Sequence, residues 1–384
     1  MVDIDILVCG SGIAGSALSL ALVGSGLKVV LVSDKQPGSS TGRRVYALSP
    51  ASQRFLARLG IWDRLDTERI EPIKAMQVFG DGEKSQLSFC SSEYGVAELG
   101  WIVSEGDLQL ALDDELNKTA VTRQSARIMD VHGTPDFIQA SFDDRTGLST
   151  SLLVGADGGQ SFVRNHVGFE SCIKTYGHRA VTFNIKASIP HSGVARQWFD
   201  KGCILAFLPL PNNFLSVVWS MPEKEAGKFL DQSEANQIAE LSQASFGKAG
   251  TLSDMSSAQS FPLSLLSLAS PVMDRVALMG DAAHIVHPLA GQGANLGIQD
   301  AEALAEVILH RGKHDPGERF LLNQYAYRRA RAVKQMQKIT DGLQYLFVLE
   351  DPFSEWLRNV GMQGVNRLPW VKKQIMKVAM YGGG

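Results

Sequence analysis

Three glycines near the N-terminus have the spacing of a turn that binds the diphosphate of a dinucleotide. They follow a short apolar run and precede a run of small apolar residues. Between a strand and a helix, the first glycine permits a tight turn, the second lets the backbone approach the diphosphate, and the third lets helix and strand pack closely. The helix N-terminus adds free N–H groups and a partial positive charge. The predicted contacts are Gly10, Gly12, Ile13, Ala14 and Gly15.

An acidic residue at the end of the next strand usually binds the adenosine ribose of such a dinucleotide. In this chain Ser33 occupies that place, and Asp34 follows it. The Ser33 hydroxyl can make one weaker hydrogen bond to the ribose, or Asp34 can replace it after a small shift. Both residues are therefore predicted to contact the cofactor.

A second motif, Gly155-Ala156-Asp157-Gly158, follows the apolar run 152–154. An Asp-Gly pair at a strand end can be only a turn. Ser161 and Arg164 follow at spacings that favour a functional turn near the cofactor and the path by which a nicotinamide enters. Asp157 is therefore a predicted cofactor contact.

A third motif begins at Gly280-Asp281, after another strand, and continues through a second glycine-rich stretch. The Asp281 carboxylate can accept hydrogen bonds from ribityl hydroxyls, and amides at a following helix N-terminus can face the pyrimidine edge of a flavin. Such N–H dipoles stabilise the negative charge of a reduced flavin. Together the three motifs predict FAD and redox chemistry. The contacts predicted here are Gly280, Asp281, Gly291, Gln292, Gly293, Ala294 and Asn295.

Two histidines lie within the third motif. His284 and His287 stand three residues apart, which could suggest a metal pair, but no carboxylate or thiol cluster accompanies them. We predict no metal and a packing role beside the flavin. No catalytic acid or base stands out, and His287 and Pro288 are the candidates nearest to the flavin.

Periodicity predicts the elements that position these motifs. Short apolar runs at 4–9, 28–32 and 275–279 are typical of buried parallel strands, and 14–23 of the helix in a βαβ unit. Further helices are expected over 49–59, where Ser49 is the N-cap and Pro50 lies in the first turn, and over 107–116. Alternating residues within 179–221 predict antiparallel strands, and the chain beyond Gln299 is mostly helical.

These elements predict an α/β fold with a Rossmann-like FAD-binding domain, an inserted and mostly antiparallel β-sheet substrate domain, and C-terminal helices. The predicted FAD domain is discontinuous and comprises residues 1–72, 97–178 and 262–335. The substrate domain comprises 73–96 and 179–261. Residues 336–384 form the C-terminal helical segment.

Composition limits the functional classes. A net charge of −3 on 384 residues indicates no nucleic-acid partner and no general attraction to anionic membranes. Four scattered cysteines fit reduced thiols in a cytoplasmic protein. Residues 6–27 carry no charge, but acidic residues precede them and five glycines interrupt them, so we expect neither a signal peptide nor a membrane span.

The three motifs, in this order, resemble the group A flavoprotein monooxygenases, which have the p-hydroxybenzoate hydroxylase fold. Further stretches resemble the ubiquinone-biosynthesis hydroxylases within that group, and this resemblance covers nearly the whole chain. They are 44–49, 59–62, 207–210, 218–220, 287–297, 358–361 and 366–369.

The resemblance implies an FAD-dependent monooxygenase that hydroxylates the ring of a polyprenylated phenol or benzoquinone. In such enzymes NAD(P)H reduces FAD, O₂ adds at flavin C4a, and the hydroperoxide transfers oxygen to the ring. By resemblance Arg44 reaches the cofactor, and residues 291–295 border the flavin ring. The protein's share is to bind FAD, exclude water and orient the substrate ring.

Three positions depart from the pattern of these relatives. Ser33 replaces the ribose-binding acid, Gly42 replaces an acid two residues before Arg44, and an arginine expected shortly before Leu108-Gln109 is absent, with Gly106 in that stretch. These losses predict weaker binding of FAD or an unusual branch of the family.

Membrane contact and assembly are left open by the sequence. The segment 370–381 mixes lysines with apolar residues, so it can be a membrane-surface helix that serves a polyprenyl substrate or a packing helix with a basic outer side; we favour packing. A cytoplasmic enzyme, peripheral to the inner membrane if that helix binds lipid, is expected. Two alternatives remain: a flavoprotein hydroxylase of another apolar aromatic, and a non-catalytic subunit of a quinone-biosynthesis complex. Homo-oligomerisation is also open.

Overall fold

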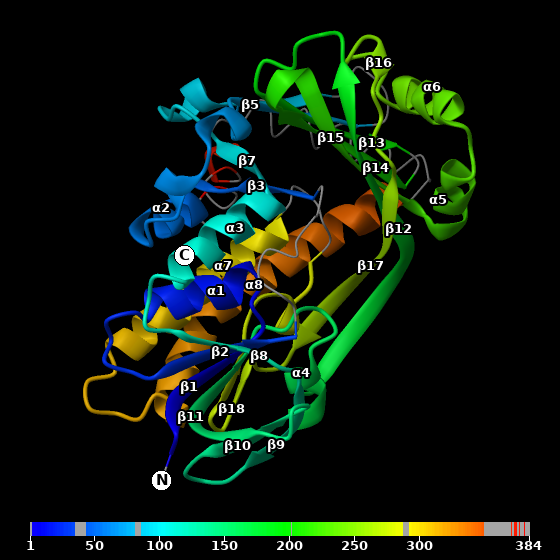
Figure 1. The fold of residues 1–384 in the computed structure, drawn as a ribbon. Coiled ribbons are helices and arrows are strands. Elements are labelled where there is room, and N and C mark those ends of the chain that lie inside the picture. Colours follow the sequence, from blue (N-terminus) through cyan, green and yellow to red (C-terminus); the bar gives the residue numbers. More distant parts are fainter. Residues whose placement is uncertain are drawn as a thin grey trace.

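The fold is taken from a computed structural model. It describes residues 2–34, 44–80, 86–200, 202–286 and 292–348, together with 370, 372–374, 376 and 380. Within these residues the strands form three sheets, two of them large, and the helices lie mainly beside the first large sheet (Figure 1).

The first large sheet is built around parallel strands. Its order is β18-β19-β11-β1-β2-β8, and all neighbours from β19 to β8 run parallel. An antiparallel pair, β9 and β10, extends from β11. The strands are β1 (Ile4–Cys9), β2 (Val29–Ser33), β8 (Thr122–Ser125), β9 (Ile128–Gly133), β10 (Ile138–Phe142), β11 (Gly147–Gly155), β18 (Val272–Met273) and β19 (Val276–Leu278).

Helices cover one face of this sheet, because alternate strand residues such as Ile6, Val8 and Leu152 pack against them in the largest hydrophobic cluster. The other face packs against β9, β10 and the short helix α4. The α-helices with described bounds are α1 (Ile13–Ala21), α2 (Pro50–Arg58), α3 (Glu105–Leu116), α4 (Phe162–Val167), α5 (Glu223–Leu230), α6 (Glu234–Ala244), α7 (Gln292–Leu309) and α8 (Arg319–Val348).

The second large sheet has the order β16-β12-β15-β14-β13-β5-β6, and β17 also pairs with β12. Every neighbouring pair is antiparallel except β13 with β5. Helices α5 and α6 lie beside one face (Figure 1). The strands are β5 (Ala75–Phe79), β6 (Gln86–Cys90), β12 (Ser171–Ala187), β13 (Val194–Asp200), β14 (Cys203–Leu210), β15 (Phe214–Pro222), β16 (Leu252–Ser253) and β17 (Gln259–Leu268).

Two long strands join the halves of the molecule. β12 and β17 pair along most of their length and run from the first sheet to the second (Figure 1). The domain limits predicted at 178/179 and 261/262 therefore fall inside continuous strands. A small third sheet, with β3 (Val45–Leu48), β7 (Gly100–Ser104) and β4 (Glu71–Ile73), lies between the halves.

The local predictions agree closely with these elements. Ser49 caps α2 through a hydrogen bond from the Ser52 amide, and Pro50 occupies the first turn. Helix α3 begins two residues earlier than predicted, because Ser104 accepts a hydrogen bond from the Asp107 amide and acts as the N-cap. Helix α7 begins at Gln292, within the glycine-rich stretch 291–295 where the third motif predicts a helix N-terminus.

Candidate active site

The three sequence motifs meet at one edge of the parallel sheet. The Ala156 amide donates to the Cys9 carbonyl at 2.7 Å, and the Met279 amide donates to the Gly155 carbonyl at 3.0 Å. Strands β1, β11 and β19 thus end side by side, although more than a hundred residues separate each from the next. The carboxyl edge of a parallel sheet is where α/β proteins bind ligands.

The glycine turn leaves room for a ligand at one position and for none at the other two. A Cβ on Gly10 would lie 2.3 Å from the Ala156 carbonyl oxygen, and Gly10 has φ +109°. A Cβ on Gly15 would lie 2.0 Å from the Gly10 carbonyl oxygen. Gly12, by contrast, faces open space and caps α1 without a side-chain hydrogen bond. The first amides of α1 therefore point into an open cradle.

Asp157 lies beside this cradle. One of its carboxylate oxygens, Oδ2, accepts from the Val163 amide at 3.1 Å, and the buried Oδ1 has no hydrogen-bond partner among the described residues. Arg164 of the same motif is buried and donates to the carbonyls of Gly159 and Ala282, at 2.8 and 3.1 Å. Arg164 thus joins the second motif to the third, and burial lowers its pKa.

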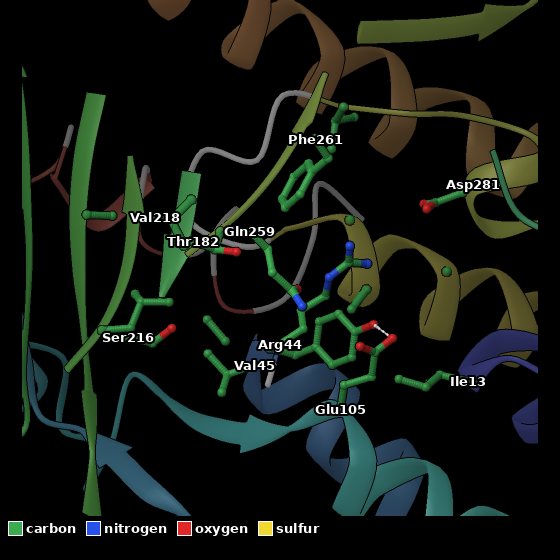
Figure 2. Close-up of a pocket in the computed structure, with 18 of the residues that line it drawn as sticks. Ile13, Arg44, Val45, Glu105, Thr182, Ser216, Val218, Gln259, Phe261 and Asp281 are labelled. Atoms are coloured by element: carbon green, nitrogen blue, oxygen red, sulfur yellow. Dashed lines mark hydrogen bonds between the residues drawn. The ribbon is translucent and has the colours of Figure 1, made fainter. Parts of the chain in front are cut away.

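Asp281 and Arg44 face the same cavity. The Asp281 carboxylate points into this cavity (Figure 2). Desolvation by the surrounding protein raises the pKa of this carboxylate, although His284 and Arg44 act in the opposite direction. The Arg44 guanidinium carbon lies 5.2 Å from the centre of the Phe261 ring on β17. Arg44 therefore stands where the two halves of the molecule meet.

A hydrogen-bonded pair lies between Arg44 and the start of α1. The Tyr46 hydroxyl donates to Glu105 Oε1 at 2.8 Å, and Figure 2 places Glu105 beside Ile13. Burial and the neighbouring Glu105 carboxylate raise the pKa of Tyr46. Farther along α3, the side-chain Nε2 of Gln109 donates to the Ser11 carbonyl at 2.9 Å and supports the glycine turn.

A buried ionic network holds the third motif in place. Asp300 of α7 accepts from the Gly280 amide at 2.9 Å, lies 2.6 Å from His284 Nε2, and accepts from Arg329 Nε of α8 at 2.6 Å. Burial acts to raise the pKa of Asp300, but His284 and Arg329 lower it to about 2. His284 therefore packs beneath the turn, and Asp281 above it is left to face the cavity.

Other predicted contacts lie away from the cavity or outside the described residues. Asp34, after the end of β2, forms an exposed ion pair with Arg127 at 3.0 Å, and Ser33 lies beside it. The Asn295 side chain is buried and bonds the Ser49 amide, the Ser52 hydroxyl and the Ala47 carbonyl, each at 2.8 Å. Their cofactor contacts remain predictions. His287, Pro288 and Gly291 lie outside the described residues.

One cavity of about 840 Å³ joins the cradle to the second sheet. At the cradle it is lined by Arg44 and by predicted contacts of the first and third motifs, including Gly12, Ile13, Ala14, Asp281, Gly293 and Ala294. The second motif contributes Ala156 and Gly158, whereas its predicted contact, Asp157, does not line the cavity. Gln292, where α7 begins, does not line it. At the other end it is lined by strands of the second sheet. Figure 2 shows Thr182, Ser216 and Val218 on that side and Ile13 and Asp281 across from them.

Sequence reasoning missed several of these residues. Nothing in the chain marked Asp300, Arg329, Tyr46 or Phe261 as partners of the site, because each acts through a contact distant in sequence. A charged residue within an apolar helix was the available signal for Asp300, which stands in α7 between the buried Ile298 and Ala301. The sheet residues that line the cavity had no such signal.

The family is settled by a match over most of the chain. Residues 3–340 match the FAD-binding domain family. The chain belongs to that family. A ubiquinone hydroxylase, UbiL of Rhodospirillum rubrum, is 31% identical over 98% of this chain and 89% of its own length. The 3-demethoxyubiquinol 3-hydroxylase of Escherichia coli is 28% identical over 98% of both chains. The predicted family and its cofactor, FAD, are confirmed.

Solved structures have the same fold. PqsL of Pseudomonas aeruginosa, in complex with 2-aminobenzoylacetate, has a TM-score of 0.80 at 24% identity, over 94% of this chain and 99% of that one. The p-nitrophenol 4-monooxygenase PnpA of Pseudomonas putida has a TM-score of 0.81 at 19% identity over the whole of both chains. The predicted fold class is confirmed by these structures. The predicted enzyme class, an FAD-dependent aromatic monooxygenase, is confirmed by the FAD-binding family and the ubiquinone hydroxylases that match the chain. Among the described residues, no helix is long and apolar enough to span a membrane.

Proposed function

We propose that this protein hydroxylates the aromatic ring of a polyprenylated phenol or benzoquinone in ubiquinone biosynthesis, with NAD(P)H as electron donor and O₂ as co-substrate. The observation that carries the proposal is the cavity that joins the dinucleotide cradle to the wall of the second sheet. The ubiquinone hydroxylases that match nearly the full chain support this choice of substrate.

The residues of the cradle fit FAD. The open space at Gly12 and the uncapped amides of α1 suit a diphosphate, because a helix N-terminus attracts anions. The orphaned Oδ1 of Asp157 needs a hydrogen-bond donor, which a cofactor hydroxyl or a bound water would provide. Asp281 would accept from ribityl hydroxyls, and Arg44 would balance the diphosphate charge.

When bound, FAD would take electrons from NAD(P)H and activate O₂. The chain's own part is to orient FAD and the substrate ring and to exclude water from them. The turn at Gly280 is fixed by Asp300, so Asp281 is preorganised. The sheet wall closes the opposite end with apolar and neutral side chains, which would keep bulk water from the reacting ring.

The C-terminal segment bears on the proposed membrane contact. Lys372 is buried and lies 2.9 Å from Glu93, and Met376 and Met380 pack in a hydrophobic cluster with Phe89 of β6. These contacts favour a packing helix, whereas Trp370 is exposed. Peripheral attachment to a membrane would rest on Trp370 or on other surfaces. Assembly into a quinone-biosynthesis complex stays a proposal.

The test uses the full chain with FAD, NADH or NADPH, and a prenylated phenol. We expect the phenol to accelerate NAD(P)H oxidation and one atom of ¹⁸O₂ to appear in the product by mass spectrometry. Asp281→Asn should weaken FAD retention, while Asp274→Asn, at an exposed surface pair, should not. A protein that ignores FAD would contradict the proposal and favour a non-catalytic subunit.

A further inference from the structure

The wall formed by the second sheet differs in charge from the rest of the cavity. Among the described residues that line the cavity, the carboxylates are Glu105, Asp113 and Asp281, all outside this sheet. Asp113 is already paired with Arg123 at 2.6 Å. Arg44 approaches the sheet but comes from the chain before β3. The sheet itself contributes one charged residue to the lining, Arg196 of β13.

Arg196 belongs to the opposite face of the sheet. Side chains alternate along a strand, and the neighbours of Arg196 in β13 and β14, Trp198 and Phe207, pack in the cluster on the far side. Its Nε donates to Gln77 Oε1 at 3.2 Å, directly across the pair with β5. Ala195, one residue earlier, packs in a different cluster with Met76 and Leu208, which line the cavity. The cavity side of the sheet is therefore uncharged.

Neutral polar side chains gather on this uncharged face. We call Thr182, Asn184, Ser216 and Gln259 the polar patch. Asn184 pairs directly with Ser216 across β12 and β15, and Thr182 pairs with Gln259 across β12 and β17. Figure 2 shows Thr182, Ser216 and Gln259 around one end of the cavity.

The polar patch has hydrogen-bonding capacity that the protein does not use. Ser216 is 5% exposed and Thr182 and Asn184 are half-buried, yet no described residue bonds the Ser216 hydroxyl, the Thr182 hydroxyl or the side-chain amide of Asn184, whose backbone amide donates to Ser256. Buried polar groups in native proteins nearly always have partners. A ligand or ordered water in the cavity is the partner that remains. These groups can donate or accept, so they suit hydroxyl or carbonyl oxygens.

An apolar strip adjoins the polar patch. It consists of Met76 and Val78 on β5, Ala195 on β13 and Leu208 on β14, and it continues into the cluster that holds Ile73 and Phe89. An alkyl chain on this strip would leave water at roughly 25 cal/mol per Å² of apolar surface.

We propose that the polar patch binds the oxygen substituents of an uncharged ring while the apolar strip binds its alkyl chain, so the enzyme selects rings that carry no carboxylate. This inference rests on the proposed function and assigns its specificity to Thr182, Asn184 and Ser216. A site for a carboxylated ring would need a cation on the polar patch, because an unpaired buried charge is costly. Arg44 does not belong to this patch, since it lies against Phe261 and comes from the chain before β3.

Two ligands and three variants test the proposal on the FAD-loaded full chain. 2-Geranylphenol and 3-geranyl-4-hydroxybenzoate share the prenyl chain and the phenol, and differ in the carboxylate. We expect the phenol to bind at least about tenfold more tightly by titration, in line with the cost of a buried unpaired charge. Thr182→Val and Asn184→Leu keep shape and remove hydrogen bonds, so each should raise the KM for the phenol about three- to tenfold. Ser253→Ala, on the exposed edge strand β16, should change nothing.

The outcomes separate this inference from the proposed function. FAD affinity should be the same in all variants, and the product of Thr182→Val or Asn184→Leu should include other hydroxylated positions. Equal or tighter binding of the carboxylate, or unchanged KM in both variants while the wild type still hydroxylates the phenol, would overturn the inference and leave the function standing. If FAD binds but the phenol neither binds nor reacts, both fail.

Discussion

The two ends of the cavity are built by different means. At the cofactor end, backbone geometry does most of the positioning: glycines without room for a Cβ, helix amides and a buried ionic network. At the sheet end, ordinary strand alternation places neutral side chains on one face and the aromatic cluster on the other. A backbone constraint demands particular residue types at fixed spacing, whereas a sheet face tolerates many. Sequence motifs therefore predict the residues of the cofactor end but not those of the sheet end.

The largest effect on FAD binding should come from removing that backbone constraint. Gly15→Ala places a Cβ about 2 Å from the Gly10 carbonyl oxygen, so α1 must move away from the sheet. Overpacking of this kind costs roughly 1–3 kcal/mol or more, and the cradle would lose its shape. We expect a lower midpoint of thermal unfolding and FAD binding reduced beyond detection by fluorescence titration. The control Gly227→Ala, in α5 with open space around it, should stabilise by up to about 1 kcal/mol.

Normal FAD affinity in Gly15→Ala would mean that the cradle tolerates a shift of α1. Gly15→Ala at the cofactor end and Thr182→Val at the sheet end would then both leave FAD binding intact. The predicted contrast between a rigid cofactor end and a tolerant sheet end would therefore fail.

The second prediction concerns the network beneath Asp281. Asp300→Asn removes the charge that His284 and Arg329 share, and it leaves a buried cation uncompensated. Breaking a buried pair costs about 3–5 kcal/mol. We expect the free energy of unfolding, measured in urea, to fall by this amount. Asp274→Asn, whose ion pair with Arg319 lies at the surface, should lose less than about 1 kcal/mol.

The same residue predicts a dependence on pH. The folded protein depresses the pKa of Asp300 from 3.8 to about 2. A depressed acid contributes stability that is complete above pH 3.8 and is lost as the pH falls toward 2. Unfolding of the wild type should therefore become easier across this window, and Asp300→Asn should show a shallower slope there. If the free energy of unfolding falls with pH at the same slope in both proteins, Asp300 is not the ionised group that we assign.

Sequence alone predicted the fold class and the three motifs at the ends of strands, since each motif is local and carries its own strand and helix signals. It could not predict that Asn295 would bind α2 instead of facing the cavity, because Ser49 and Ser52 lie more than 240 residues away. Nor could it predict the pairing of Tyr46 with Glu105, which depends on β3 lying beside β7. The polar patch needed the register of β12 with β15 and β17.

A smaller effect is expected where a carboxylate faces the diphosphate cradle. Glu105 lies beside Ile13 and adds negative charge near the phosphates of a bound dinucleotide. Glu105→Gln should therefore lower the dissociation constant of FAD about three- to tenfold, and the gain should shrink as salt screens the charge. Asp107→Asn is the control in the same helix turn, since Asp107 is paired with Arg69 at 3.0 Å. Weaker FAD binding in Glu105→Gln would show instead that the carboxylate accepts a hydrogen bond from the cofactor.

The smallest effect is expected at the predicted ribose contact. Asp34 is exposed and paired with Arg127, and it does not line the cavity. Asp34→Asn should therefore change FAD affinity less than about threefold, because an exposed ion pair contributes little. Arg127→Ala is the matched variant, since it frees Asp34 without removing it. If Asp34→Asn weakens FAD binding tenfold while Arg127→Ala strengthens it, Asp34 leaves Arg127 when the cofactor binds and takes the place of the missing acid at Ser33. FAD binding at the cofactor end would then depend on a side chain that changes partners, and not mainly on backbone geometry. The two ends of the cavity would differ less in how they bind their ligands.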